Sequence, residues 1–171
     1  DLESAVNTSI LIVQTGIPVA RMELLDNVQM GACITYSKLE GYEEKPTIFF
    51  EFHGTETGAK EQAETVQAIA EEFGGSAFQW TSKMEDRNKL WQARHDAYYA
   101  AIALRSGCQG WATDVCVPVS RLAECINETK DDLEETGLIS PLVGHVGDGN
   151  FHMLYIVCLL YTSDAADDDH C

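Results

Sequence analysis

The sequence predicts an α/β or α+β sandwich in which helices pack against a sheet, and three observations support this prediction. The chain has 171 residues, which is enough for one domain with a full hydrophobic core. Hydrophobic residues make up 45% and charged residues 23% of it, as in ordinary globular proteins. Segments with helical spacing of apolar residues alternate along the chain with short segments rich in β-branched and aromatic residues.

Capping residues and glycines predict where the elements begin and end. Asp26 or Asn27 is predicted to cap one helix, and Thr55 to cap a long acidic helix that ends at Gly74. The acidic outer face of that helix is expected to be solvated. The predicted order is helix 1–14, strand 19–25, helix 27–38, strand 47–52, helix 56–73, strand 76–80, helix 83–104, strand 111–117, helix 120–135, strand 139–146 and strand 151–157.

Charge and motifs exclude several classes of function. The formal net charge of −17 argues against binding to a nucleic-acid backbone or to an anionic membrane surface, since both need a basic footprint. No glycine-rich phosphate-binding motif follows the first predicted strand, so neither common nucleotide site is predicted. No run approaches the roughly 20 apolar residues of a membrane span, and no transmembrane segment is predicted.

The two ends of the sequence carry separate expectations. The segment from Asp1 lacks the features of a signal or transit peptide, and we expect it to come from the interior of a longer protein. Residues 158–171 have no periodicity and carry a near-terminal acidic run, so they are predicted to be a disordered, non-native tail. The six cysteines form no CxxC pair and are predicted to be reduced thiols.

The segment GHVGDGNFH contains two histidines around an Asp-Gly dipeptide. Asp-Gly favours a two-residue hairpin turn, which would place His145 directly opposite His152. Directly opposed residues have Cβ atoms about 4.5–5.5 Å apart, so the two imidazoles could share one metal ion. The alternative is a pair of ordinary strand histidines beside a tight turn.

A second candidate site lies in the predicted helix 83–104. Trp91, Arg94 and Tyr98 have the spacing of one helical face, and an arginine held among aromatic side chains can grip a carboxylate at two points. The alternative is an arginine at the helix edge with its head in water. The neighbouring His95 is expected at the surface. In the next strand Asp114 could orient an arginine or a helix end, and Cys116 is predicted to be a small core residue.

Five blocks of the sequence, in order, resemble the C-terminal domain of FAD-linked oxidases, in the branch of the D-2-hydroxy-acid dehydrogenases. The resemblance covers residues 1–157. The blocks are PVARMELLD (18–26), FEFHG (50–54), LWQAR (90–94), TDVCVP (113–118) and GHVGDGNFH (144–152).

The resemblance implies a two-domain flavoenzyme. FAD would be held mainly by a domain outside this chain, and residues 1–157 would form the substrate domain. That domain would be an α+β, ferredoxin-like sandwich with helices packed on one face of a mostly antiparallel sheet. The chain alone is expected to be inactive. The family also implies a mitochondrial location, with cytochrome c as the electron acceptor of the full enzyme.

Roles for single residues also follow from the resemblance. Arg94 would bind the substrate carboxylate, His145 and His152 would bind a divalent metal, zinc or manganese, and Asn150 would lie beside it. The metal would polarise the substrate hydroxyl while a hydride leaves for the flavin, so that D-lactate becomes pyruvate. The family's third metal ligand and its base belong to a Glu-His-Gly block, which would follow the point where this sequence diverges at Cys158.

The resemblance also bears on the substrate. Relatives that act on D-2-hydroxyglutarate carry a lysine where this chain has Ala112, so a monocarboxylate such as D-lactate is expected. Three alternatives stay open: a D-2-hydroxyglutarate or glycolate dehydrogenase of the same family, a non-catalytic ferredoxin-like binding module, and a stand-alone metal hydrolase that uses His145 and His152.

Overall fold

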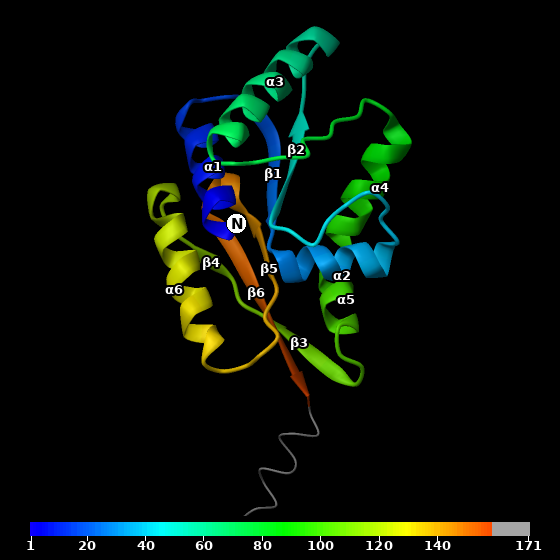
Figure 1. Cartoon of the computed structure of the whole chain (residues 1–171), viewed down its shortest axis with the longest axis vertical. Helices are drawn as coiled ribbons and strands as arrows, with labels where there is room; N and C mark the ends of the chain where they lie inside the picture. Colours follow the sequence, from blue (N-terminus) through cyan, green and yellow to red (C-terminus); the bar gives the residue numbers. More distant parts are fainter. Residues whose placement is uncertain (159–171) are drawn as a thin grey trace, which may run out of the picture.

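The computed structural model describes residues 1–158 as an antiparallel sheet with associated helices (Figure 1). This arrangement confirms the predicted α+β class. The elements are α1 (Leu2–Gln14), β1 (Val19–Leu25), α2 (Asn27–Ser37), β2 (Thr47–Phe52), α3 (Glu56–Glu72), α4 (Met84–His95), α5 (Ala97–Ala103), β3 (Cys108–Ala112), β4 (Val115–Cys116), the 3₁₀ helix η1 (Val119–Arg121), α6 (Leu122–Glu134), β5 (Leu142–His145), the 3₁₀ helix η2 (Val146–Asp148) and β6 (Asn150–Cys158).

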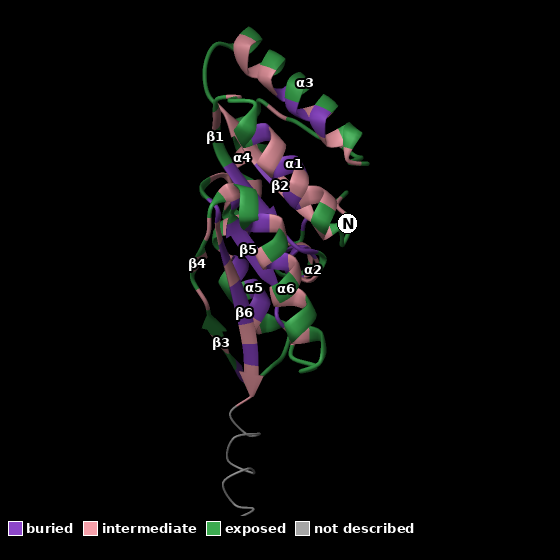
Figure 2. Cartoon of the chain, turned by 90° about the vertical axis from the view of Figure 1, so that its left-hand side faces the viewer, coloured by how far each residue is buried: buried purple, intermediate pink, exposed green. Residues whose placement is uncertain are grey.

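The sheet has the strand order β2-β1-β5-β6-β3, and the short strand β4 also pairs with β6. Each pairing between neighbours in the described part of the chain is antiparallel. β5 and β6 lie inside the sheet, and Figure 2 shows buried residues running along both of them. The end of the β5–β6 hairpin is therefore attached to the buried centre of the sheet.

Helices cover both faces of this sheet, so the prediction that they pack on one face is wrong. Figure 1 shows α1 and α6 on one side of the strands, with α2, α4 and α5 on the other. Adjacent strand residues belong to different core clusters: Leu24 packs with the group of α1, α3 and α6, whereas Leu25 packs with the group of α2, α4 and α5. Both residues are fully buried, because each face of the central strands has its own layer of helices.

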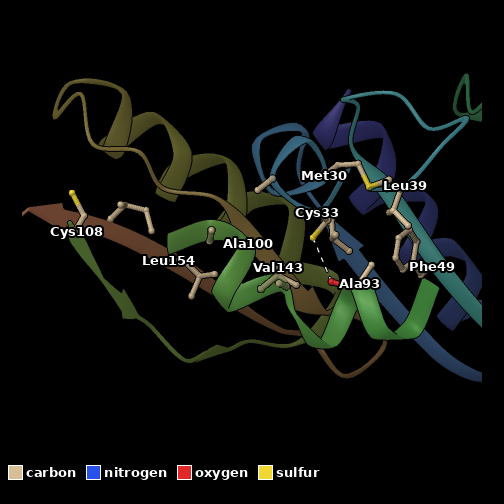
Figure 3. Packing of buried hydrophobic residues seen from close by; sticks show 14 residues of the cluster. Met30, Cys33, Leu39, Phe49, Ala93, Ala100, Cys108, Val143 and Leu154 are labelled. Atoms are coloured by element: carbon tan, nitrogen blue, oxygen red, sulfur yellow. Dashed lines mark hydrogen bonds between the residues drawn. The ribbon is translucent and has the colours of Figure 1, made fainter. Parts of the chain in front are cut away.

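The core on the α2, α4 and α5 side is built around small side chains (Figure 3). Ala93, Ala97 and Ala100 are buried on α4 and α5, and their size lets these helices lie close to α2. The Cys33 thiol donates to the Ala93 carbonyl across this contact, at 3.5 Å. Burial raises the pKa of Cys33, so this thiol is an inert core group.

Two predicted elements in the middle of the chain differ from the structure. Residues 76–80 form no strand, because Ala77 has a left-handed backbone (φ 57°) that breaks the extended conformation. The predicted helix 83–104 is divided at Asp96 into α4 and α5. Asp96 leaves the helical conformation (φ −80°, ψ 2°), and its carboxylate accepts two hydrogen bonds from the Gln92 side chain one turn earlier.

The predicted strand 111–117 is interrupted at Thr113 and Asp114 and becomes β3 and β4. The main-chain N–H of Met153 donates to the Thr113 hydroxyl at 2.9 Å, where a regular ladder would use a carbonyl. The carbonyl of Thr113 is thereby left for another donor.

The turn between β5 and β6 is longer than predicted. Val146–Asp148 form η2 and Gly149 closes the turn in the left-handed region (φ 73°), so four residues separate the strands. His145 therefore lies opposite Asn150, and His152 opposite Val143, which corrects the predicted direct opposition of the two histidines. Val146 is fully buried in the core as part of η2, which extends the connection beyond the two residues Asp148 and Gly149.

The last strand reaches the end of the described residues. β6 ends at Cys158, one residue past the predicted domain boundary, and the rest of the predicted tail lies outside the described residues. Among residues 1–158, none of the helices combines the length and the apolarity needed to cross a bilayer.

Gly149 should be required at the hairpin turn, whereas Gly147 should not. A Cβ at Gly149 would lie 2.1 Å from the Val117 carbonyl oxygen, and the φ of 73° disfavours L-residues. A Cβ at Gly147 would meet Met22 Cε at an ordinary 3.5 Å. Gly149→Ala should lower the free energy of unfolding by at least about 1–2 kcal/mol, and Gly147→Ala by less than about 0.5 kcal/mol. Urea denaturation of both variants measures this, and equal effects would contradict it.

Candidate active site

His145 and His152 come together on one face of the hairpin although they are not directly opposed. His145 faces Asn150 across the ladder, and His152 lies two residues further along β6, so the two side chains are diagonal neighbours. Their ring centroids are 5.7 Å apart and the rings are nearly perpendicular, at 87°. The longer turn therefore changes the register but keeps the two imidazoles together.

Each ring is held through its Nδ1 atom by a hydrogen-bond acceptor. His152 Nδ1 lies 2.9 Å from the carbonyl oxygen of Thr113, the group freed by the interruption between β3 and β4. His145 Nδ1 lies 2.8 Å from Oε1 of Glu23. A carbonyl and a carboxylate can only accept, so Nδ1 of each ring carries the hydrogen and Nε2 of each neutral ring carries the lone pair.

Glu23 is a site residue that the sequence reasoning missed. It lies on β1 with a side chain only 6% exposed. Its Oε2 accepts from Nε and Nη2 of Arg94, at 3.1 and 2.9 Å, while its Oε1 faces His145. The available signal was an acidic residue within the apolar strand segment Met22–Leu25, where burial requires a partner.

A cleft of about 560 Å³ opens beside this cluster. Glu23, Arg94 and His145 line it together with Arg21 and Trp91. The apolar part of its lining comes from α1, the α1–β1 connection and β1, through Ile12, Val13, Ile17, Val19, Ala20 and Met22, and His95, Gly147 and the acidic Asp148 complete it. A small anion with an apolar side chain matches such a lining.

Helix α4 is attached to the sheet mainly by ion pairs. Arg87 Nη2 lies 2.7 Å from Oε1 of Glu51 on β2, and two turns later Arg94 pairs with Glu23 on β1. Between them, Trp91 makes an edge contact with Phe49, at 6.4 Å between centroids, and the guanidinium of Arg21 lies 4.4 Å from its ring centroid.

The structure separates the predicted aromatic partners of Arg94. Trp91 shares the cleft with it, but Tyr98 lies on α5 beyond the break at Asp96, where its hydroxyl donates to the Gly110 carbonyl at 3.1 Å. His95 is exposed, as predicted. The side chain of Arg94 is 15% exposed, which contradicts the alternative of an arginine with its head in water.

Asn150 and Asp114 lie next to the histidines. Asn150 Nδ2 donates to Oδ1 of Asp114 and to the Val115 carbonyl, at 2.8 and 3.1 Å, so the remaining polar atom of the amide is the acceptor Oδ1. Asp114 thus orients an asparagine and no arginine. Cys116 is exposed, which corrects its prediction as a core residue, because β4 lies at the margin of the sheet.

The metal ligands predicted from the sequence are an incomplete set here. Within residues 1–158, no group of three His, Cys, Asp or Glu side chains is arranged to hold a metal ion. Glu23 is beside His145, but it contacts Nδ1 of that ring, so it acts as an outer partner of the imidazole.

The Glu51 carboxylate should make α4 docking dependent on pH. Burial alone would raise the pKa of Glu51, but hydrogen bonds from Arg87 and His53 and the charges of Arg21 and Arg87 hold that pKa below its ordinary value. A lowered carboxyl pKa adds stability above the ordinary value near 4.3, and this stability is lost as the pH falls through the folded-state pKa.

We expect Glu51→Gln to lower the free energy of unfolding by about 1.5–3 kcal/mol at pH 7. The variant should also lose less stability than the wild type between pH 6 and pH 3. Urea midpoints at pH 6 and pH 3 measure the difference. Glu72→Gln, at the exposed end of α3, is the matched control and should keep the wild-type profile. If Glu51→Gln lost as much stability between pH 6 and pH 3 as the wild type, the proposed role of the Glu51 carboxylate in α4 docking would be refuted.

Comparison with known proteins places this geometry in context. The model of a family described as FAD linked oxidases, C-terminal domain, matches residues 1–168. "Probable D-lactate dehydrogenase, mitochondrial" of Danio rerio is 48% identical over 156 residues, which is 91% of this chain and 31% of the relative. "D-lactate dehydrogenase (cytochrome), mitochondrial" of Arabidopsis thaliana is 39% identical over 160 residues, 94% of this chain and 27% of the relative.

A solved structure shares the fold without sequence similarity of note. Alkyldihydroxyacetonephosphate synthase superposes with a TM-score of 0.65 at 9% identity, over 96% of this chain and 36% of that one. The chain spans less than a third of the length of the two D-lactate dehydrogenases that it matches. From the family match, the chain belongs to the FAD linked oxidases, C-terminal domain family.

Proposed function

We propose that this chain is the substrate-binding part of a flavin-dependent dehydrogenase that oxidises the D-2-hydroxy acid D-lactate to pyruvate. One observation carries the proposal: an arginine and two held imidazoles meet beside one partly apolar cleft, in a chain of the FAD-linked oxidase family. FAD, bound mainly by a domain outside this chain, would supply the hydride acceptor.

Arg94 is suited to bind the substrate carboxylate. A guanidinium has five N–H donors, and Glu23 takes the Nε and one Nη2 hydrogen. The other donors remain for a ligand in the cleft that Arg94 lines. Because Glu23 fixes the plane of the guanidinium, a carboxylate would meet a preoriented partner.

The two histidines have the donor chemistry that a divalent metal such as zinc or manganese requires. Both Nδ1 hydrogens are committed, to Glu23 and to Thr113, so the Nε2 lone pairs of the neutral rings are the available ligand atoms. A metal ion held there would supply Lewis-acid polarisation of the substrate hydroxyl. Two imidazoles need a third protein ligand, which in the family belongs to the Glu-His-Gly block.

The resemblance to the family also bears on the size of the substrate, and the relatives' names bear on the cellular context. Ala112 is an exposed residue at the end of β3, and it brings no second cation where D-2-hydroxyglutarate relatives have lysine. The names of the relatives support a mitochondrial location and a cytochrome, such as cytochrome c, as the electron acceptor.

Reduction of the flavin in the full-length flavoenzyme tests the substrate. D-Lactate should bleach the flavin faster than D-2-hydroxyglutarate or glycolate does, because Ala112 brings no cation for a second carboxylate and the cleft has an apolar wall for the substrate methyl group. Stopped-flow absorbance measures the three rates. A faster reaction with either competitor would replace D-lactate as the substrate. No reduction by any of the three would favour a non-catalytic binding module.

Arg94→Lys should lower kcat/KM for D-lactate by roughly 10- to 150-fold. Lysine keeps a positive charge beside Glu23 but loses the planar fork, and a charge-assisted hydrogen bond contributes about 1.5–3 kcal/mol. Alanine is a poor test, because it would leave the buried Glu23 carboxylate unpaired.

Arg87→Lys is the matched control for this experiment. Arg87 is on the same helix and pairs with Glu51 away from the cleft, so kcat/KM should change less than twofold. Steady-state assays of both variants decide. Equal losses in the two variants would show that arginines of α4 act only by attaching the helix.

A further inference from the structure

We propose that Glu23 is a positioning residue that holds the Arg94 guanidinium and the His145 imidazole in one fixed arrangement, with one carboxylate oxygen for each. This inference deepens the proposed function, and its consequences for catalysis rest on it. The geometry itself can be tested without the flavin.

The Glu23 side chain is buried. It is 6% exposed, so an isolated carboxylate would be strongly disfavoured there. Arg94 compensates this charge with two N–H groups on Oε2. Three separate elements, β1, α4 and β5, therefore meet at one carboxylate.

The two carboxylate oxygens of Glu23 have different partners. Oε2 is used by Arg94 and Oε1 faces His145 Nδ1 at 2.8 Å, so neither partner can move without disturbing the other. His145 is 48% exposed and its ring would otherwise be free to rotate. The contact with Glu23 fixes both the orientation and the tautomer of that ring.

Glu23→Gln should reverse the tautomer of His145. The guanidinium of Arg94 only donates, so the glutamine must turn its oxygen toward Arg94 and its NH₂ toward His145. Nδ1 of His145 then has to accept, and the hydrogen moves to Nε2. His152 is the internal control, because the Thr113 carbonyl holds its Nδ1 hydrogen in both proteins.

The measurement is a long-range ¹H–¹⁵N correlation spectrum of the imidazoles, recorded on the 171-residue chain at a pH where the rings are neutral. The wild type should show Nδ1–H at both His145 and His152, and Glu23→Gln should change only His145. A wild-type spectrum with Nε2–H at His145 overturns the proposal, even if the variant fails to fold. An unchanged His145 in a folded variant also overturns it.

Zinc titration of the same samples separates this inference from the proposed metal site. If His145 and His152 bind Zn²⁺ through Nε2, Glu23→Gln should weaken binding by about 10- to 100-fold, as loss of an outer partner does. A reversed tautomer with no zinc binding in either protein would support the role of Glu23 and show that His145 and His152 alone do not hold zinc. Unchanged zinc affinity in the variant would contradict the positioning role.

Discussion

The buried carboxylate of Glu23 is the constraint on which the candidate site depends. A charge with 6% of its side chain exposed has to be compensated by the protein, and here the compensation comes from a different element, α4, through Arg94. The second oxygen then orients His145 at the end of β5. The position of the helix on the sheet and the orientation of the hairpin histidine are therefore set by the same group.

Helix α4 shows how such polar contacts can add to a small apolar interface. Ala93 is its one buried residue, yet the helix lies on β1 and β2 because Arg87 and Arg94, two turns apart, reach Glu51 and Glu23. Trp91 fills the space between these ion pairs. This arrangement places the Arg94 guanidinium at the cleft, where Arg21 of β1 also lies.

Local signals in the sequence were sufficient for the helix starts and the position of the hairpin. Asp26 and Thr55 accept the expected N-cap hydrogen bonds, and Gly149 has the left-handed backbone of the turn. The predicted register was wrong because Val146–Asp148 form a 3₁₀ helix, which lengthens the turn to four residues. Glu23 was missed because its partner Arg94 is 71 residues away, so no local pattern connects them. Helix placement on both faces likewise depends on long-range packing.

The pairing with Glu23 also changes what Arg94 can offer a ligand. Its positive charge is already partly balanced, so attraction of an anion into the cleft depends on Arg21 as well. Arg21 lies over Trp91, its Nε is 3.7 Å from Oε2 of Glu51, and 44% of its side chain is exposed. What Arg94 contributes is a guanidinium of fixed orientation beside His145. A carboxylate bound by fixed geometry keeps its neighbouring carbon at a defined distance from the imidazoles, whereas one held by charge alone could slide. The cluster is therefore better suited to orienting a substrate than to tight binding of any anion.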